Sequence, residues 1–227
     1  MSDSPQTAAR ISDTRSQSSG EISNNQKGRQ RDEAVLNFLD VHPADAAILV
    51  FLGFFLTIHK ALKRLWILEK RGKVKMVGSA FKHDGRKRRH IWSGRLISKV
   101  QHEYDLTLIL LKMHVDRVVR GFAVDERNPD AQAWINGGMV YLELDRGTER
   151  KWKELRERFA VYNETEHDVL WVCITPTRMN QMMKNSDNPH FWFTTFSQAL
   201  VNPHERIWLN KAGELMSLPL AKMSTQI

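Results

Sequence analysis

The periodicity of the apolar residues changes near residue 100, and this change limits the chain to folds with two differently built parts. Before that point, apolar residues recur at spacings of three and four, which is typical of amphipathic helices. After it, short apolar runs alternate with stretches of helical spacing, which is typical of an α/β domain with a parallel or mixed sheet. A chain of 227 residues is long enough for two domains. We therefore expect an α+β or α/β protein with a helical first domain.

The composition excludes several classes of protein. Hydrophobic residues make up 41 %, which is enough for a core and excludes a wholly disordered chain. The single cysteine, Cys173, excludes a disulfide framework and a cysteine-based zinc site, and we expect it to be a small buried hydrophobe. The nine histidines lack the spacing of a zinc-binding helix, and the lack of a glycine-rich phosphate loop argues against a nucleotide-driven enzyme. No cofactor and no metal are expected, except Mg²⁺ if the nuclease-like site described below is active.

Residues 1–30 are rich in Ser, Gln, Asn and Thr, and the first aromatic residue is Phe38. Such a segment buries too little apolar surface to offset its ordering entropy, so we predict a disordered tail. Its first twenty residues contain no apolar stretch of the kind found in secretory signals. We therefore expect a reducing, cytoplasmic location.

The segment 31–95 has the element order of a winged helix-turn-helix. Helices are predicted over 32–41, capped by Asp32, over 44–52, and over 56–71, closed by Gly72. The residues 73–77 alternate between polar and apolar, as a half-buried strand does, and 89–92 read as the returning strand. A charged loop with the turn pair Asp84-Gly85 separates them. Three helices followed by a hairpin with a basic tip predict a winged helix.

The positive charge is concentrated in this first domain. Segment 59–95 holds 13 of the 34 Lys and Arg residues but only two of the 26 acidic residues, a net charge of +11. The rest of the chain carries −3, so the overall +8 arises from one segment. This distribution is typical of a local phosphate-binding face, and double-stranded DNA is the partner it indicates.

A recognition helix must present donors to base edges while its other face packs on the preceding helix. A wing reaches the flanking phosphates or the minor groove, and Trp92 beside it is a further candidate for contact with DNA. The alternatives are a solvated basic face and a membrane-associated segment over 46–58. That uncharged stretch is too short to span a bilayer, which needs about 20 residues, so no membrane is expected. The predicted DNA contacts are Thr57, His59, Lys60, Lys63 and Arg64 on the helix, and Lys82, Arg86, Lys87, Arg88 and Arg89 on the wing.

The segment 96–220 is predicted to alternate between helices and strands. It begins with a long apolar helix over 104–119, and a loop at Pro129-Asp130 precedes the next predicted strand. The predicted strands are 139–144, 169–174, 191–196 and 206–209, and the predicted helices are 149–159, one after Pro176, and 197–200.

Three acidic residues of this second domain have the spacing of a metal-dependent nuclease site. Glu143 and Asp145 are two residues apart on a predicted strand and so share a face, and Asp130 precedes them. Such acids can hold Mg²⁺, which activates water against a phosphodiester. Nucleases of the PD-(D/E)xK type place a lysine where Asp145 stands. Lys151 or Lys153, on the next predicted helix, could replace it only if its side chain faces back toward the acids. The alternative is structural: the acids cap the following helix or pair with Arg146.

Several short motifs resemble the replication-relaxation family of plasmids and integrative conjugative elements. The most specific is the run from Glu143 to Thr148, Glu-Leu-Asp-Arg-Gly-Thr. The others are His102-Glu103, Pro129-Asp130-Ala131, Phe193-Thr194-Thr195, Asn202-Pro203 and Ile207-Trp208-Leu209. The resemblance covers about residues 32–220.

This resemblance implies a winged helix over 31–95 followed by a degenerate, non-catalytic endonuclease-like domain over 96–220. It further implies an accessory role in plasmid replication or mobilisation, with a relaxase or a replication initiator as protein partner. A homodimer is also compatible with it. Two other functions stay open at this point: a transcriptional regulator built on the same winged helix, and an active nuclease that uses Mg²⁺ at Asp130, Glu143 and Asp145.

Overall fold

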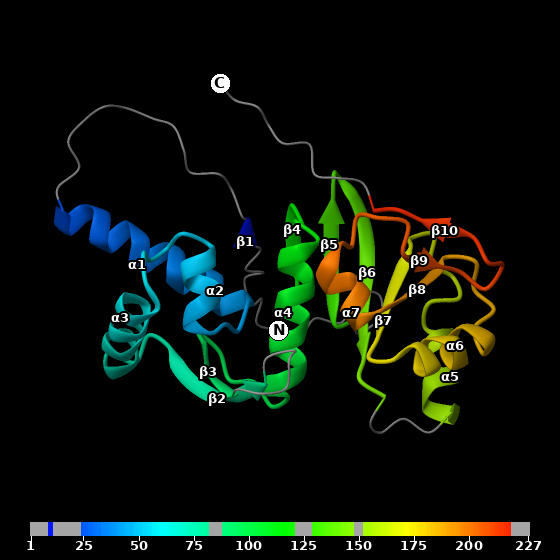
Figure 1. Ribbon diagram of the computed structural model, residues 1–227, viewed down its shortest axis with the longest axis horizontal. Coiled ribbons are helices and arrows are strands. Elements are labelled where there is room, and N and C mark those ends of the chain that lie inside the picture. Colours follow the sequence, from blue (N-terminus) through cyan, green and yellow to red (C-terminus); the bar gives the residue numbers. More distant parts are fainter. Residues whose placement is uncertain (1–8, 11–23, 82–87, 121–128, 148–151, 219–227) are drawn as a thin grey trace, which may run out of the picture. The chain divides into compact units, whose positions relative to one another are not determined.

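The computed structural model describes residues 9–10, 24–81, 88–120, 129–147 and 152–218. The chain divides into two compact units (Figure 1). Residues 12–107 form one, here called the helical unit, and residues 1–11 and 108–227 form the other, the sheet unit. The sequence predicts a boundary near residue 95, whereas the units divide within helix α4 (Val100–Lys112).

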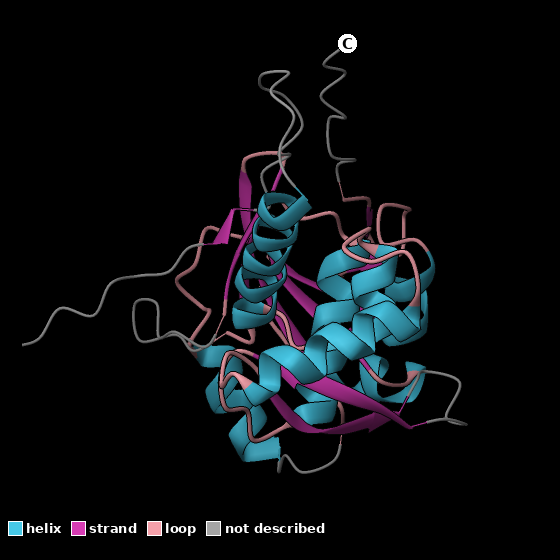
Figure 2. Ribbon diagram, turned by 90° about the vertical axis from the view of Figure 1, so that its left-hand side faces the viewer, coloured by secondary structure: helices cyan, strands magenta, loops and turns pink. Residues whose placement is uncertain are grey.

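The helical unit contains the three helices and the hairpin that the sequence predicts; Figure 2 draws helices in cyan and strands in magenta. In chain order these elements are α1 (Asn24–Val41), α2 (Ala46–Phe51), α3 (Ile58–Lys70), β2 (Lys75–Phe81) and β3 (Arg88–Ser93). The first turns of α4 also belong to this unit, because Gln101 accepts a hydrogen bond from the Phe81 amide and Arg95 pairs with Glu103.

Side-chain caps fix where α2 and α3 begin. The carboxylate of Asp45 accepts a hydrogen bond from the amide of Ile48, 2.8 Å away, and the hydroxyl of Thr57 accepts one from the amide of Lys60 at 3.2 Å. Each cap satisfies an amide that the helix itself leaves without a partner. Gly72 follows α3 with a φ of +67°, a conformation that favours glycine.

The first helix starts earlier than the sequence predicts. It begins at Asn24, so Asp32 lies inside α1 instead of capping it. The residues of α1 before Asp32 are mostly Gln, Lys and Arg, which form helices readily. Because they are polar, apolar periodicity could not predict this part of the helix. The predicted disordered tail over 1–30 is therefore wrong for 24–30, and wrong also for strand β1 (Ala9–Arg10). The rest of that segment lies outside the described residues.

The hairpin of the helical unit is antiparallel, with Met76 opposite Trp92 and Phe81 opposite Arg88. A register shift lies between Met76 and Gly78. Residue Ala44, between α1 and α2, forms a β-bridge with Trp92 and thereby adds a third short extended segment to the hairpin. Trp92 is only 1 % exposed, so it belongs to the core and is no longer a candidate for contact with DNA.

The sheet unit is built on a mixed eight-stranded sheet in the order β1-β4-β5-β6-β7-β8-β9-β10, counted over the described residues. The central pairs β6–β7 and β7–β8 are parallel, and the other pairs are antiparallel. The strands after β1 are β4 (Arg117–Val119), β5 (Ala131–Ile135), β6 (Gly138–Asp145), β7 (Val169–Cys173), β8 (Phe191–Thr195), β9 (Trp208–Leu209) and β10 (Leu215–Met216).

The helix predicted over 104–119 is wrong at its end. It stops at Lys112, His114 then takes a φ of +46°, and residues Arg117–Val119 form β4. The sequence prediction also lacked β5 and β10. Strand β5 joins β6 through Asn136 and Gly137, both with positive φ, as a tight hairpin turn requires.

Alternate residues of the three parallel strands bury an aromatic core on one face of the sheet. This cluster joins the strands to helices α5 (Trp152–Ala160) and α6 (Pro176–Lys184). The ring of Trp171 on β7 meets Phe159 edge-on, with centroids 5.1 Å apart, and stacks near Phe193. Short helix α7 (Phe196–Val201) follows β8 directly, its first turn fixed by a capping box between Thr195 and Gln198.

Candidate functional site

Helix α3 has one buried face and one solvent-facing stripe. The side chains of Ala61, Leu65 and Leu68 are buried in the helical unit. Residues on the opposite side recur at spacings of three and four, which places them in one row along the helix. The row consists of His59, Lys63, Trp66 and Lys70, all exposed, with Lys60 exposed beside it.

The sequence analysis predicted three members of this surface and missed two. His59, Lys60 and Lys63 are exposed, as a DNA contact requires. Trp66 and Lys70 were not predicted, although they stand three and seven residues after Lys63 and so had a readable signal.

Thr57 and Arg64 have structural roles: Thr57 caps α3, and Arg64 joins it to α1. Thr57 is exposed, but its hydroxyl caps α3. Arg64 is half-buried and forms an ion pair with Asp32, its Nε donating to Oδ1 at 2.8 Å. The hydrogen bond to Asp32 raises the pKa of Arg64 against the opposing effect of burial. This pair joins α1 to α3 and holds the stripe in place.

Of the two arginines in β3, one is exposed and the other is half-buried. Arg88 is exposed, and its guanidinium lies over the ring of Phe81, 4.7 Å from the centroid. Arg89 instead pairs with the buried Asp45 at 3.1 Å. The hydroxyl of Tyr104 donates to the same carboxylate, and burial together with Asp45 raises the pKa of that hydroxyl far above its usual value. Lys82, Arg86 and Lys87 lie outside the described residues.

The acids predicted as a nuclease site lie on one side of the sheet unit, where arginines neutralise them. Glu143 on β6 is 1 % exposed and forms an ion pair with Arg158 of α5, and the Tyr162 hydroxyl donates to it. The same guanidinium lies 3.4 Å from Asp130, whose other oxygen accepts from the Leu144 amide. The structure thus brings Asp130 and Glu143 together around one guanidinium.

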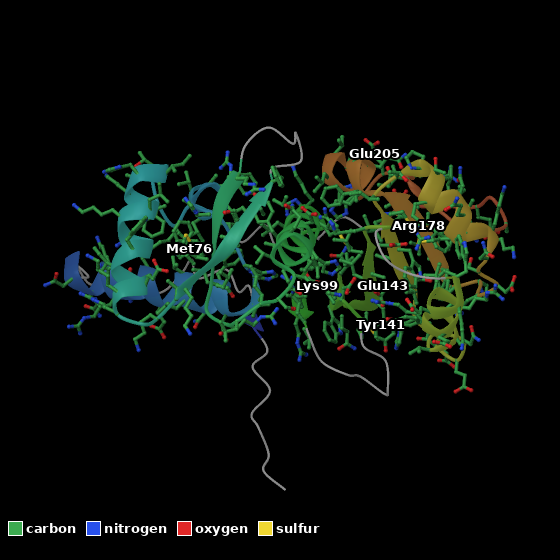
Figure 3. All side chains as sticks on the ribbon, turned by 90° about the horizontal axis from the view of Figure 1, so that it is seen from below. Met76, Lys99, Tyr141, Glu143, Arg178 and Glu205 are labelled. Atoms are coloured by element: carbon green, nitrogen blue, oxygen red, sulfur yellow. The ribbon has the colours of Figure 1, made fainter. Side chains whose placement is uncertain are left out.

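Asp145 belongs to a second ion pair. Its Oδ2 accepts a hydrogen bond of 2.6 Å from Nε of Arg178 on α6, and its Oδ1 accepts from the Gly147 amide. Figure 3 labels Glu143 and Arg178 within this unit. Lys153, one of two candidates to replace the nuclease lysine, is largely exposed and lies 4.0 Å from Glu157, while Lys151 lies outside the described residues.

This arrangement does not fit a Mg²⁺ site. A divalent cation requires carboxylate oxygens that converge on a shared position. Between Asp130 and Glu143 that position is taken by the guanidinium of Arg158, and Asp145 turns to Arg178. Among the described residues, no three His, Cys, Asp or Glu side chains are grouped so that they could hold a metal.

Cleavage assays test this assignment directly. We expect supercoiled and linear DNA to stay intact when the protein is incubated with Mg²⁺ or Mn²⁺, because the acids are held by Arg158 and Arg178. Agarose gels report nicking and linearisation. Cleavage by the wild-type protein that disappears in the Glu143→Ala variant would contradict the assignment.

Cys173 is not a reactive thiol. It lies fully buried on β7, and its Sγ is 3.5 Å from the sulfur of Met182. Burial raises the pKa of this thiol well above its usual value, and the charge of Asp145 adds to the effect. The expectation of a small buried hydrophobe is confirmed.

Comparisons with protein-family models, with curated proteins and with solved structures gave no match to this chain. In the part of the chain that the structure describes, every helix is too short or too polar to cross a bilayer.

Proposed function

We propose that the helical unit is a winged helix that binds double-stranded DNA. Helix α3 enters the major groove, and the hairpin β2–β3 is the wing. The observation that carries the proposal is the exposed basic stripe on α3, opposite a buried apolar face and followed in the chain by the hairpin with exposed Arg88. The bridge from Ala44 to Trp92 supports it, because winged helices add a short strand between their first two helices to the wing.

The electrostatics of the stripe favour phosphate contact. Lys63 and Lys70 in the stripe and Lys60 beside it are exposed, and their long side chains reach outward from the helix. Each lysine that neutralises a phosphate releases counterions and contributes about 0.9 to the slope of log K against log salt. Arg64 and Arg89, held by Asp32 and Asp45, position α3 and the hairpin instead.

The triple variant Lys60→Ala, Lys63→Ala and Lys70→Ala tests the proposal. We expect its salt slope on a fluorescent random-sequence duplex to fall by about 2.7, one contact for each lysine. Affinity at low salt falls with it. Fluorescence anisotropy titrations at several salt concentrations give both quantities.

The matched control removes the same charge from the sheet unit. Lys112, Lys153 and Lys184 are exposed lysines on α4, α5 and α6, and their triple alanine variant should keep the wild-type slope. An equal decrease of the salt slope in both triple variants would show only a general effect of charge and would refute the role of α3. The absence of salt-dependent duplex binding by the wild type would refute the proposal as a whole.

We propose further that the protein acts as a DNA-binding accessory in plasmid or conjugative-element replication and mobilisation, with a relaxase or an initiator as partner. The sheet unit then serves for docking or for homodimer contact instead of catalysis. Neutralisation of Glu143 and Asp145 by arginines supports a non-catalytic unit. Footprinting of the protein on its own replicon tests this role: protection at an origin is expected, whereas protection at promoters would indicate a transcriptional regulator.

A further inference from the structure

An aromatic side chain stands in the middle of the basic stripe on α3. Trp66 is 53 % exposed, although the helix has a buried face that accommodates Leu65, one residue before it, and Leu68, two residues after it. Spacings of seven, three and four residues place Trp66 in the same row as His59, Lys63 and Lys70. One large aromatic ring therefore lies among histidine and lysine side chains, which are residue types that contact phosphates and base edges in DNA complexes.

The position of this ring limits what it can contact when α3 lies in the major groove. Lysines reach the phosphates along the groove walls, whereas the centre of the stripe faces the base edges. The indole N–H can donate to a phosphate, but the apolar faces of the ring gain nothing from one. The thymine C5-methyl group is an apolar feature of the groove that those faces can contact. Burying a methyl group against an exposed aromatic ring is favourable for both surfaces.

We infer that Trp66 reads thymine methyl groups in the major groove. This inference rests on the proposed function and deepens it, because it states which base the helix selects. His59 and Lys63 beside the ring then supply polar contacts to neighbouring base edges or phosphates. The resulting site contains at least one thymine whose methyl group, and not its hydrogen-bonding pattern, sets the affinity.

Deoxyuridine substitution isolates that methyl group. A duplex is first selected by the wild-type protein from a random library, and each thymine is then replaced singly by deoxyuridine, which lacks only the C5-methyl group. Loss of one buried methyl group corresponds to about a fourfold weaker dissociation constant. We expect this loss at one or two positions for the wild type, and no difference between the two bases at those positions for Trp66→Ala.

Two further variants make the result unambiguous. Trp66→Gln keeps a long side chain without the ring and should also lose the discrimination, so it decides the matter if the alanine variant fails to fold. Val201→Ala removes an exposed apolar side chain from α7 of the sheet unit, outside the proposed DNA-binding unit, and should keep the discrimination.

The outcomes separate this inference from the proposed function. Recognition of thymine by Trp66 is refuted if the selected site contains no thymine. It is also refuted if both Trp66 variants still discriminate thymine from deoxyuridine. In either case the proposal of duplex binding is unaffected. Failure of the wild type to bind any duplex with salt dependence overturns the proposed function, and this inference falls with it.

Discussion

The substitution Arg158→Ala is expected to destabilise the sheet unit by about 3–5 kcal/mol. It removes the guanidinium that neutralises Glu143, a carboxylate 1 % exposed on a central strand, and leaves Asp130 close to that unpaired charge. It also removes the cation that lies over the ring of Trp171. Urea denaturation measures the loss, and hydrogen exchange of peptides from β6 and β7 locates it.

Two controls define the cause. Lys153→Ala breaks an exposed ion pair on the same helix, and such pairs contribute only about 0–1 kcal/mol. The double variant Arg158→Met with Glu143→Leu removes both buried charges and should be more stable than Arg158→Ala, because a buried pair replaced by apolar groups is often neutral. It should stay below the wild type, because Asp130 loses the guanidinium and the Tyr162 hydroxyl loses its acceptor on Glu143. A loss below about 1 kcal/mol in Arg158→Ala would contradict the buried ion pair.

The substitution Trp92→Ala is expected to cost the helical unit about 3–5 kcal/mol. Trp92 is one of the largest fully buried side chains, its backbone forms the bridge to Ala44, and its ring meets His90 edge-on. The cavity left by alanine lies where the hairpin joins the helices. Binding to the random-sequence duplex should fall together with the helical unit, and thermal unfolding followed by circular dichroism measures the destabilisation.

Trp92→Phe is the matched control. Among the described atoms, the indole Nε1 of Trp92 is buried without a hydrogen-bond partner, so its removal sacrifices no bond. The phenyl ring keeps much of the packing, and we expect a loss well below that of alanine with duplex binding retained. A phenylalanine variant as unstable as the alanine variant would show that the indole N–H has an undetected partner.

Local patterns predicted the elements that pack one face against a core. Helix α3, strand β7 and helix α6 lie close to their predicted ranges, because apolar spacing and turn residues are readable over a few neighbours. The turn Asn136-Gly137 was readable in the same way, and it would have predicted β5. Strand β4 was harder to predict, since a short apolar run after a helix fits either structure.

The contacts of the candidate site could not be predicted in this way. Asp32 and Arg64 are 32 residues apart in the chain, and Asp145 and Arg178 are 33 apart. Such pairs depend on how whole elements pack, which no local spacing encodes. The sequence therefore placed Glu143 and Asp145 on one face correctly but could not show that Arg158 and Arg178 neutralise them. The exposure of Trp66 is likewise a property of the packed unit.

The pairing of β1 with β4 affects how the sheet unit folds. Ala9 on β1 lies opposite Val118 on β4. Strand β1 is therefore synthesised before the helical unit, and β4, with which it pairs, is synthesised after it. Closing so long a loop is entropically unfavourable and slow compared with the local hairpins. Deleting residues 1–10 should therefore expose the β4 edge of the sheet and promote self-association through that edge, while helices α1, α2 and α3 stay folded.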